Sequence, residues 1–119
     1  MSIFKKMLGY PAEETSQVDY TKSESNELAR DMIEFVKVES AEEVLSLADK
    51  LLGGYPLVIN FQEVPVSEAN QIISFLSGII YAKGGVNSSM QPKVFLFALD
   101  SVLEDGSVLE FYEEYKEVE

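Results

Sequence analysis

Four runs of the sequence predict the β-strands of one folded domain. The run 32–39 (MIEFVKVE) is rich in β-branched and aromatic residues, which favours a strand. The run 56–61 (PLVINF) is almost continuously apolar, as expected of a strand covered on both faces. Residues 86–90 predict a weak strand and residues 93–99 a strong one, and Pro92 marks the joint between them.

Two stretches between these strands place apolar residues at helical spacing. Ser40 to Glu43 has the S-x-x-E form of a capping box, which predicts a helix that starts at Ser40, with Ser40 accepting from the Glu43 backbone and Glu43 reaching back. Ser67 is the expected cap of a second helix, which Gly84 and Gly85 end. The expected buried stripes are Val44, Leu47, Ala48 and Leu51 in the first helix, and Ala69, Ile72, Ile73, Leu76, Ile79 and Ile80 in the second.

The order of these elements predicts a small α/β domain with a mixed β-sheet and two crossover helices. The sheet is expected to be parallel where the helices cross over and antiparallel at the final hairpin. After a turn at Asp105–Gly106, the apolar residues of 108–112 fit either a last strand or a helix. Two helices can cover one face of such a sheet, so the other face would need a partner, which favours a homodimer.

The first residues of the chain have the pattern of an amphipathic helix, and we expect residues 1–9 to form a membrane-targeting segment. Its apolar face would enter the bilayer interface while its lysines meet anionic headgroups. The alternative is a frayed terminus, or one that folds back on its own domain. Residues 10–30 are expected to be a flexible linker, and residues 31–119 the folded domain. The predicted membrane-binding residues are Ile3, Phe4, Lys5, Lys6, Met7 and Leu8.

Composition and charge exclude several classes of function. The chain has 119 residues, a formal net charge of -12, no cysteine and no histidine. Disulfides, thiolate nucleophiles, imidazole acid-base chemistry and the usual zinc sites are therefore excluded. The acidic field opposes binding to nucleic acid. The absence of cysteine leads us to expect an intracellular protein. No apolar run approaches the roughly 20 residues that span a bilayer, and no secretory signal is present.

Clusters of acidic residues are the candidate reactive groups. They could bind a hard cation or act as an acid-base pair, but each lies in a predicted loop, helix start or tail, and none has the spacing of a calcium loop. The solvated-surface interpretation is favoured, so no catalytic residue, cofactor or metal is predicted and the protein is not expected to be an enzyme. The clusters are Glu13–Glu14, Glu42–Glu43, Glu104–Asp105 and Glu113–Glu114.

The stretch 75–85 (FLSGIIYAKGG) carries a gap of small residues within the second helix. Glycine inside a helix costs about 1 kcal/mol relative to alanine, so Gly78 needs an explanation. One explanation is close packing on the chain's own sheet or first helix. The other is close approach by a second helix or a bound peptide, with Phe75 and Tyr81 as the walls of a groove.

The segment 66–99 resembles the core of the SepF family of cell-division proteins. In that family a helix with the pattern D-F-L-S-G-x-x-Y-A-x-x-G leads into a hairpin and an I-F-L-x-x-P strand. The run YPLVINFQEVP is similar to the family's V-V-V-N-L strand. The order of elements agrees over residues 31 to 112. The matching residues are Asn60, Ala69, Phe75, Leu76, Ser77, Gly78, Tyr81, Ala82, Gly85, Phe95 and Leu96.

The resemblance implies an adaptor without catalysis or cofactor. It would bind the C-terminal peptide of FtsZ, the tubulin-like division GTPase, and tether FtsZ filaments to the membrane as a homodimer. Its place would be the cytoplasm, at the inner face of the membrane at the division site. The alternative is a soluble regulatory or ligand-binding α/β domain without a membrane role. The expected partner-binding or dimer groove consists of Phe75, Ser77, Gly78, Tyr81, Ala82, Gly85, Phe95 and Phe97.

Three positions depart from the family pattern. Ser74 stands where the bacterial pattern has an aspartate, and Gln91 where it has a hairpin glycine. The resemblance associates that glycine with assembly of dimers into polymers, so its absence implies an archaeal-type member that stops at the dimer. Ala98–Leu99 stands where many relatives have a proline.

Overall fold

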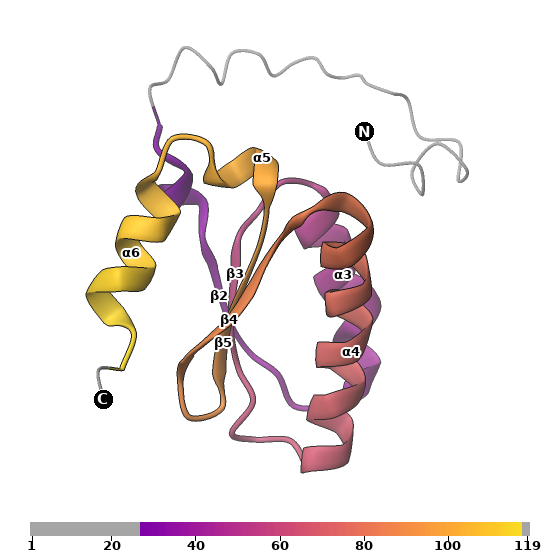
Figure 1. The fold of residues 1–119 in the computed structure, drawn as a ribbon. Coiled ribbons are helices and arrows are strands. Elements are labelled where there is room, and N and C mark those ends of the chain that lie inside the picture. Colours follow the sequence, from indigo (N-terminus) through magenta and orange to yellow (C-terminus); the bar gives the residue numbers. More distant parts are fainter. Residues whose placement is uncertain (1–26, 118–119) are drawn as a thin grey trace.

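Four strands form the centre of the fold in the computed structural model, which describes residues 27–117 (Figure 1). The strand order in the sheet is β2-β3-β5-β4. The elements along the chain are η2 (Ala29–Met32), β2 (Glu34–Lys37), η3 (Ala41–Glu43), α3 (Val44–Leu52), β3 (Leu57–Asn60), α4 (Val66–Lys83), β4 (Gly85–Gln91), β5 (Val94–Leu99), α5 (Asp100–Leu103) and α6 (Ser107–Tyr115).

The sheet is mixed, as the order of elements predicted. Strand β2 pairs in parallel with β3, with Glu34 opposite Leu57, and α3 makes the crossover between them. Strand β5 runs antiparallel to both of its neighbours, β3 and β4. The β4–β5 hairpin carries a register shift between Ser89 and Gln91. The expected α/β fold class is therefore confirmed; the expected amphipathic helix and residues 10–26 of the expected linker lie outside the described residues.

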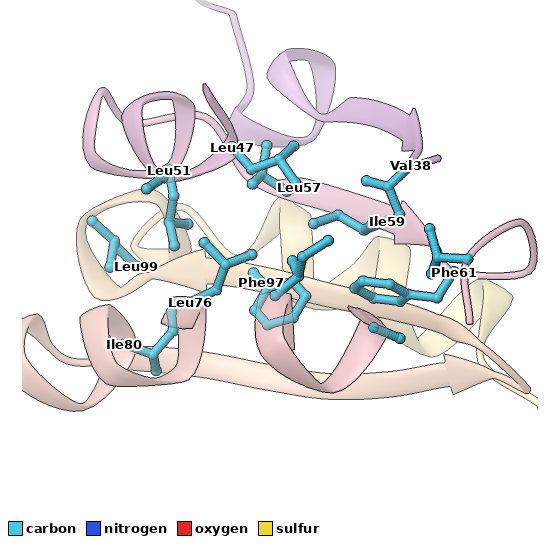
Figure 2. Packing of buried hydrophobic residues seen from close by; sticks show 14 residues of the cluster. Val38, Leu47, Leu51, Leu57, Ile59, Phe61, Leu76, Ile80, Phe97 and Leu99 are labelled. Atoms are coloured by element: carbon cyan, nitrogen blue, oxygen red, sulfur yellow. The ribbon is translucent and has the colours of Figure 1, made fainter. Parts of the chain in front are cut away.

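Helices α3 and α4 lie side by side on one face of the sheet and bury the larger core (Figure 1). Both predicted stripes face inward, with Val44, Ile73 and Ile79 at the partly buried margin. In Figure 2, side chains of the two helices meet those of the central strands, and Leu76 and Phe97 have no exposed surface. The buried cluster consists of Val38, Leu47, Ala48, Leu51, Leu57, Ile59, Phe61, Val64, Ala69, Ile72, Leu76, Ile80, Phe97 and Leu99.

The opposite face of the sheet is covered by α6, with α5 and η2 beside it (Figure 1). The run that fitted either a strand or a helix is thus a helix. Val108 is fully buried, and the Tyr112 hydroxyl donates to the carbonyl oxygen of Ser89 in β4 (3.1 Å). The expectation that a partner chain must cover this face is wrong, because the chain covers much of it itself. The smaller buried cluster consists of Val58, Met90, Leu96, Ala98 and Val108.

Both helix starts differ in detail from the predicted caps. The 3-10 turn of η3 precedes α3, and this tighter turn brings the Glu42 N–H to the Ser40 hydroxyl oxygen (2.9 Å). The Glu43 carboxylate accepts from the Glu39 N–H (2.8 Å) instead of reaching back to Ser40. Helix α4 begins directly after Pro65, so Ser67 lies in its first turn and does not cap it.

Gly84 and Gly85 end α4 as predicted and lead directly into β4. Gly84 adopts φ +89°, a conformation that favours glycine, and its carbonyl oxygen accepts from the Asp100 N–H (3.0 Å). A Cβ on Gly85 would collide with the carbonyl oxygen of Ala98 in β5. The close approach of these two strands therefore requires glycine.

The folded part begins before the expected boundary at residue 31. Ala29 and Arg30, which the sequence analysis assigned to the linker, form η2 and pack against α6. Segment η2 stands at the amino end of β2, whereas the hairpin turn and the loop from β3 to α4 lie at the opposite end of the sheet (Figure 1). Segment η2 and the hairpin turn thus occupy opposite ends of the domain.

Candidate functional site

The outward face of α4 presents large apolar groups to solvent. Phe75 is 45% exposed and Tyr81 is 92% exposed, and Ala82 beside them is also exposed. Gly78 lies on the same face, and a Cβ built there would meet no atom within 4 Å. Packing within the described domain therefore does not explain Gly78. The remaining explanation from the sequence is close approach by another chain.

The exposed surface of α4 and the neighbouring strand is uncharged. From Ala69 to Ala82 the helix has no charged residue, and β4 has none, although charged residues make up 25% of the chain. The Asn87 side-chain amide of β4 donates to the Ser77 hydroxyl of α4 (2.5 Å), which joins the two elements at the edge of the sheet. The result is one continuous neutral surface on an otherwise acidic protein.

The structure divides the predicted groove residues into three groups. Phe75, Gly78, Tyr81 and Ala82 share the exposed face of α4, with Ser77 half-buried at its side. Phe95 lies elsewhere, at the hairpin end of β5. Gly85 and Phe97 are structural: Gly85 allows the close contact with β5, and Phe97 has no exposed surface, so it supports the site from behind and cannot touch a partner directly.

A pocket of about 240 Å³ opens at the hairpin end, where the first turns of α4 approach β5. The rings of Phe61 and Phe95 meet edge to face at 5.8 Å and form its floor. Val66, which is 67% exposed, stands at the rim. The pocket is lined by Phe61, Val64, Val66, Ala69, Asn70, Ile73, Lys93 and Phe95.

Lys93 gives this apolar pocket a positive charge. Four other cations of the described chain pair with carboxylates: Arg30 with Glu114, Lys37 with Glu63, Lys50 with Glu34, and Lys116 with Glu113. Among residues 27–117, Lys83 and Lys93 have no carboxylate within 4.0 Å, and Lys93 is the one in the pocket. An ammonium without a carboxylate partner, beside the buried Phe61 ring and the partly exposed Phe95 ring, fits a ligand that brings both a carboxylate and apolar groups.

Sequence reasoning found Phe95 but missed most of this pocket. Lys93 has a left-handed backbone with φ 65°, and its carbonyl oxygen accepts from the Phe61 N–H (2.7 Å). That bond ties the hairpin turn to the end of β3. The position of Pro92 before Lys93 was a signal for the turn, but no pattern indicated that Phe61 and Val64 meet it.

A polar network holds η2 against the end of the domain where α6 begins. The Asp105 carboxylate accepts from the Ala29 N–H (2.9 Å) and from the N–H (2.8 Å) and hydroxyl (2.7 Å) of Ser107. These hydrogen bonds stabilise the charged form, with the Ala29 bond contributing most, and they lower the pKa of Asp105. Arg30 donates to both carboxylate oxygens of Glu114, and this bond raises the pKa of Arg30.

The acidic clusters do not converge on a metal site in the described part of the chain. Within residues 27–117, no group of three acidic side chains is arranged to hold a cation. Glu13–Glu14 lies outside this range. No helix among the described residues is both long and apolar enough to span a bilayer. The predicted membrane-binding residues, Ile3 to Leu8, lie outside the described residues.

Comparison with known proteins identifies the family of the domain. A family model described as "Cell division protein SepF" matches residues 33–102. The similar proteins carry that same description. One from Carboxydothermus hydrogenoformans is 39% identical over 72 residues, which are 60% of this chain and 53% of the relative. One from Caldanaerobacter subterraneus is 32% identical over 74 residues, 62% and 55% of the two chains.

A third relative, from Bacillus cytotoxicus, is 36% identical over 75 residues, which cover 63% of this chain and 48% of its own. The chain thus spans about half the length of the relatives it matches. The matched region begins at β2 and extends through α4 and the hairpin to α5, so it contains both the neutral surface and the pocket. The family model covers more than half of the residues, and the chain therefore belongs to the SepF family of cell-division proteins.

Proposed function

We propose that this protein is a division adaptor that binds the C-terminal peptide of FtsZ and tethers its filaments to the cytoplasmic membrane. The observation that carries the proposal is the pocket beside Lys93, which lies inside the region that matches the family. An exposed apolar pocket with one unpaired cation suits a short peptide with apolar side chains and a carboxylate. Its modest size predicts weak binding by a single site.

The neutral surface of α4 and β4 supports a homodimer. In a chain with a net charge of -12, two copies repel each other least where neither carries charge. Gly78 permits two α4 helices to approach closely, while Phe75 and Tyr81 supply apolar area to bury. An isologous dimer through α4 would hold two copies of the pocket and two N-terminal segments.

Duplication would convert weak contacts into firm attachment. A short amphipathic segment such as residues 1–9 binds a bilayer marginally by itself. Two such segments and two peptide pockets on one dimer act at high effective concentration, which strengthens attachment to a filament at a membrane without any new contact. The domain would then serve as a link between two surfaces, and catalysis is not part of this function.

Co-sedimentation with anionic liposomes tests the proposal, with FtsZ from the same organism present or absent. The full chain should pellet and carry FtsZ down, and a chain lacking residues 1–10 should do neither. Lys93→Glu should still pellet but bind the FtsZ C-terminal peptide at least about tenfold more weakly, a loss of about 1.4 kcal/mol. Lys83→Glu is the matched control. It reverses the charge of the other cation that has no carboxylate partner among residues 27–117, and Lys83 lies at the end of α4, away from the pocket.

Each result that contradicts the proposal points to a different part of it. Equal effects of Lys93→Glu and Lys83→Glu would mean that the pocket is not the binding site. Binding of FtsZ without binding to liposomes would leave a soluble division factor. A full chain that binds neither would show that the fold is present without this function.

A further inference from the structure

A second exposed apolar surface lies on the other side of the sheet, beside α6. We call Phe35, Phe111 and Tyr115 the aromatic patch. The Phe35 and Phe111 rings meet edge to face at 5.9 Å, and Phe111 and Tyr115 lie 4.7 Å apart. Phe35 is 66% exposed and Tyr115 is 52% exposed. Exposed aromatic rings that already contact one another form a surface suited to apolar binding.

A depression in the sheet extends this patch. Helix α6 covers the sheet incompletely on the side of β2, and an open hollow of about 280 Å³ remains there. Phe35 belongs to both features, so the patch and the hollow form one continuous surface. The hollow is lined by Phe35, Val36, Lys37, Val58, Asn60 and Val94.

Carboxylates border the aromatic patch on α6. Glu114 forms an ion pair with Arg30, whose guanidinium lies over the Phe111 ring at 5.5 Å, and Glu110 precedes Phe111 on the same helix, one turn before Glu114. Arg30 pairs with Glu114, whereas Glu110 has no cation within 4.0 Å in the described chain. An apolar centre with an acidic border fits a short segment that carries apolar residues on one face and cations on the other.

The chain itself contains such a segment. On a helix, Ile3, Phe4, Met7 and Leu8 form an apolar face, and Lys5 and Lys6 lie on the other side. The described chain begins at Glu27, next to η2, which packs on α6 and places Arg30 against the patch. Residues 10–26 are long enough for the return, since a chain of that length without regular structure has a root-mean-square span of roughly 23 Å.

We propose that, away from a membrane, residues 1–9 dock on the aromatic patch of their own domain. Apolar side chains cover Phe35, Phe111 and Tyr115, and the lysines approach the carboxylates of α6. The patch and the bilayer then compete for the same apolar face, a consequence that rests on the proposed membrane anchor. Helix α4 and the Lys93 pocket lie on the other side of the sheet, so docking leaves them free.

A single tryptophan detects this docking without any lipid. The chain has no tryptophan, so Phe4→Trp introduces one reporter within the full chain. Docking predicts blue-shifted emission and protection from acrylamide. Phe35→Ser or Tyr115→Ser in the same chain should shift the emission to the red and remove the protection. Leu45→Ser is the control, because it removes an exposed apolar side chain from α3, on the opposite side of the sheet.

Two fluorescence results would overturn the proposal. One is emission that is already solvent-exposed in the Phe4→Trp chain and unchanged by Phe35→Ser and by Tyr115→Ser. The other is a blue shift that disappears on dilution, because the segment would then dock on a second copy. Both readings are independent of liposomes, so they remain decisive if the membrane anchor itself fails.

Liposome titration tests the competition. If the docked state is populated about nine times in ten, removing it should tighten the apparent Kd for anionic vesicles about tenfold. Phe35→Ser should therefore bind vesicles more tightly than the wild type, and Leu45→Ser should not. Unchanged affinity in Phe35→Ser overturns the competition, whereas absent binding by every chain counts against the anchor and not against docking.

Discussion

Against the α3 and α4 face of the sheet, fourteen buried residues of the described chain form one cluster, whereas five do so against the α6 face. The first face is held by side-chain burial. The second depends more on polar contacts, including the Asp105 network, the Arg30–Glu114 pair and the Tyr112–Ser89 hydrogen bond. Apolar burial involves no titrating group and no ion pair, whereas these exposed contacts weaken in acid and are screened by salt, so α6 should open before α4 does.

Matched leucine truncations on the two faces test this difference most strongly. Leu76 and Leu96 are both buried. Leu76 belongs to α4 and faces the sheet, whereas Leu96 belongs to β5 and lies in the cluster on the α6 side. Leu76→Ala should lower the free energy of unfolding by about 2–5 kcal/mol. Leu96→Ala should fall at the low end of that range, because α6 can move into the cavity. Urea denaturation measures both, and equal losses would mean that the two faces are equally rigid.

Gly85→Ala tests the strand contact that both faces share. The added methyl group would press on the carbonyl oxygen of Ala98, so strands β4 and β5 must separate slightly. Overpacking of this kind should cost about 1–3 kcal/mol of unfolding free energy. Gly78→Ala is the control for a glycine with free space, and in thermal unfolding of the monomer it should be neutral or slightly stabilising.

The outer surfaces also differ, because α4 is neutral where α6 is acidic, and a substitution at Gly78 tests what that neutrality is for. Gly78→Gln should leave the monomer folded, since a side chain at this position would start in open space, but it should block helix approach. We expect the dimer dissociation constant to rise at least about tenfold, or about 1.4 kcal/mol. Sedimentation equilibrium measures this dissociation constant. The control is Ser46→Gln, at an exposed position of α3. An unchanged dissociation constant in Gly78→Gln would mean that the dimer interface lies elsewhere.

The smallest expected effect is a change in the pH dependence of stability. The pKa of Asp105 is lowered from its usual 3.8 in the folded protein, so the carboxylate stabilises the fold above that value. As the pH falls below 3.8 and through the folded pKa, this contribution is lost. Asp105→Asn should lower stability at neutral pH, and the unfolding free energies of the two proteins should converge in acid.

The same acid titration needs a control for the lost charge. Asp49→Asn removes one exposed carboxylate from α3, where its side chain makes no hydrogen bond or ion pair with the described residues. Asp49→Asn should therefore follow the wild-type curve. If Asp105→Asn also follows it, the network does not stabilise the junction between η2 and α6.

The sequence predicted the parts of the fold that follow from burial. The stripes of both long helices, the paired glycines at residue 84 and the strong strand at residues 93–99 each reflect one local requirement. The conformation of residues 107–115 was left open because their apolar spacing suits a strand and a helix equally well. In the structure they form a helix that contacts η2 and β4. Ser40 caps the first turn as predicted, but its side chain accepts from Glu42 and not from Glu43, because that turn is 3-10 and not α-helical.

Only part of the candidate site was predicted, because local patterns do not show which residues face solvent or which distant residues meet. The sequence could not predict that Gly78 is exposed, because a small residue suits a contact within the domain and a contact with another chain equally well. The Lys93 pocket depends on a left-handed backbone and on a loop that joins distant residues. Neither produces a periodic signal. The family resemblance gave the residues of α4, but only the structure separated surface residues such as Tyr81 from supporting ones such as Phe97.

The position of the two attachment points at opposite ends of the sheet has a mechanical consequence under the proposed function. A filament held at the pocket and a bilayer held through the segment before η2 would pull along β2 and β3. Hydrogen bonds between these parallel strands run roughly across that direction, so tension loads them together as shear and does not peel them apart one by one. The domain should therefore transmit constriction force while it stays folded.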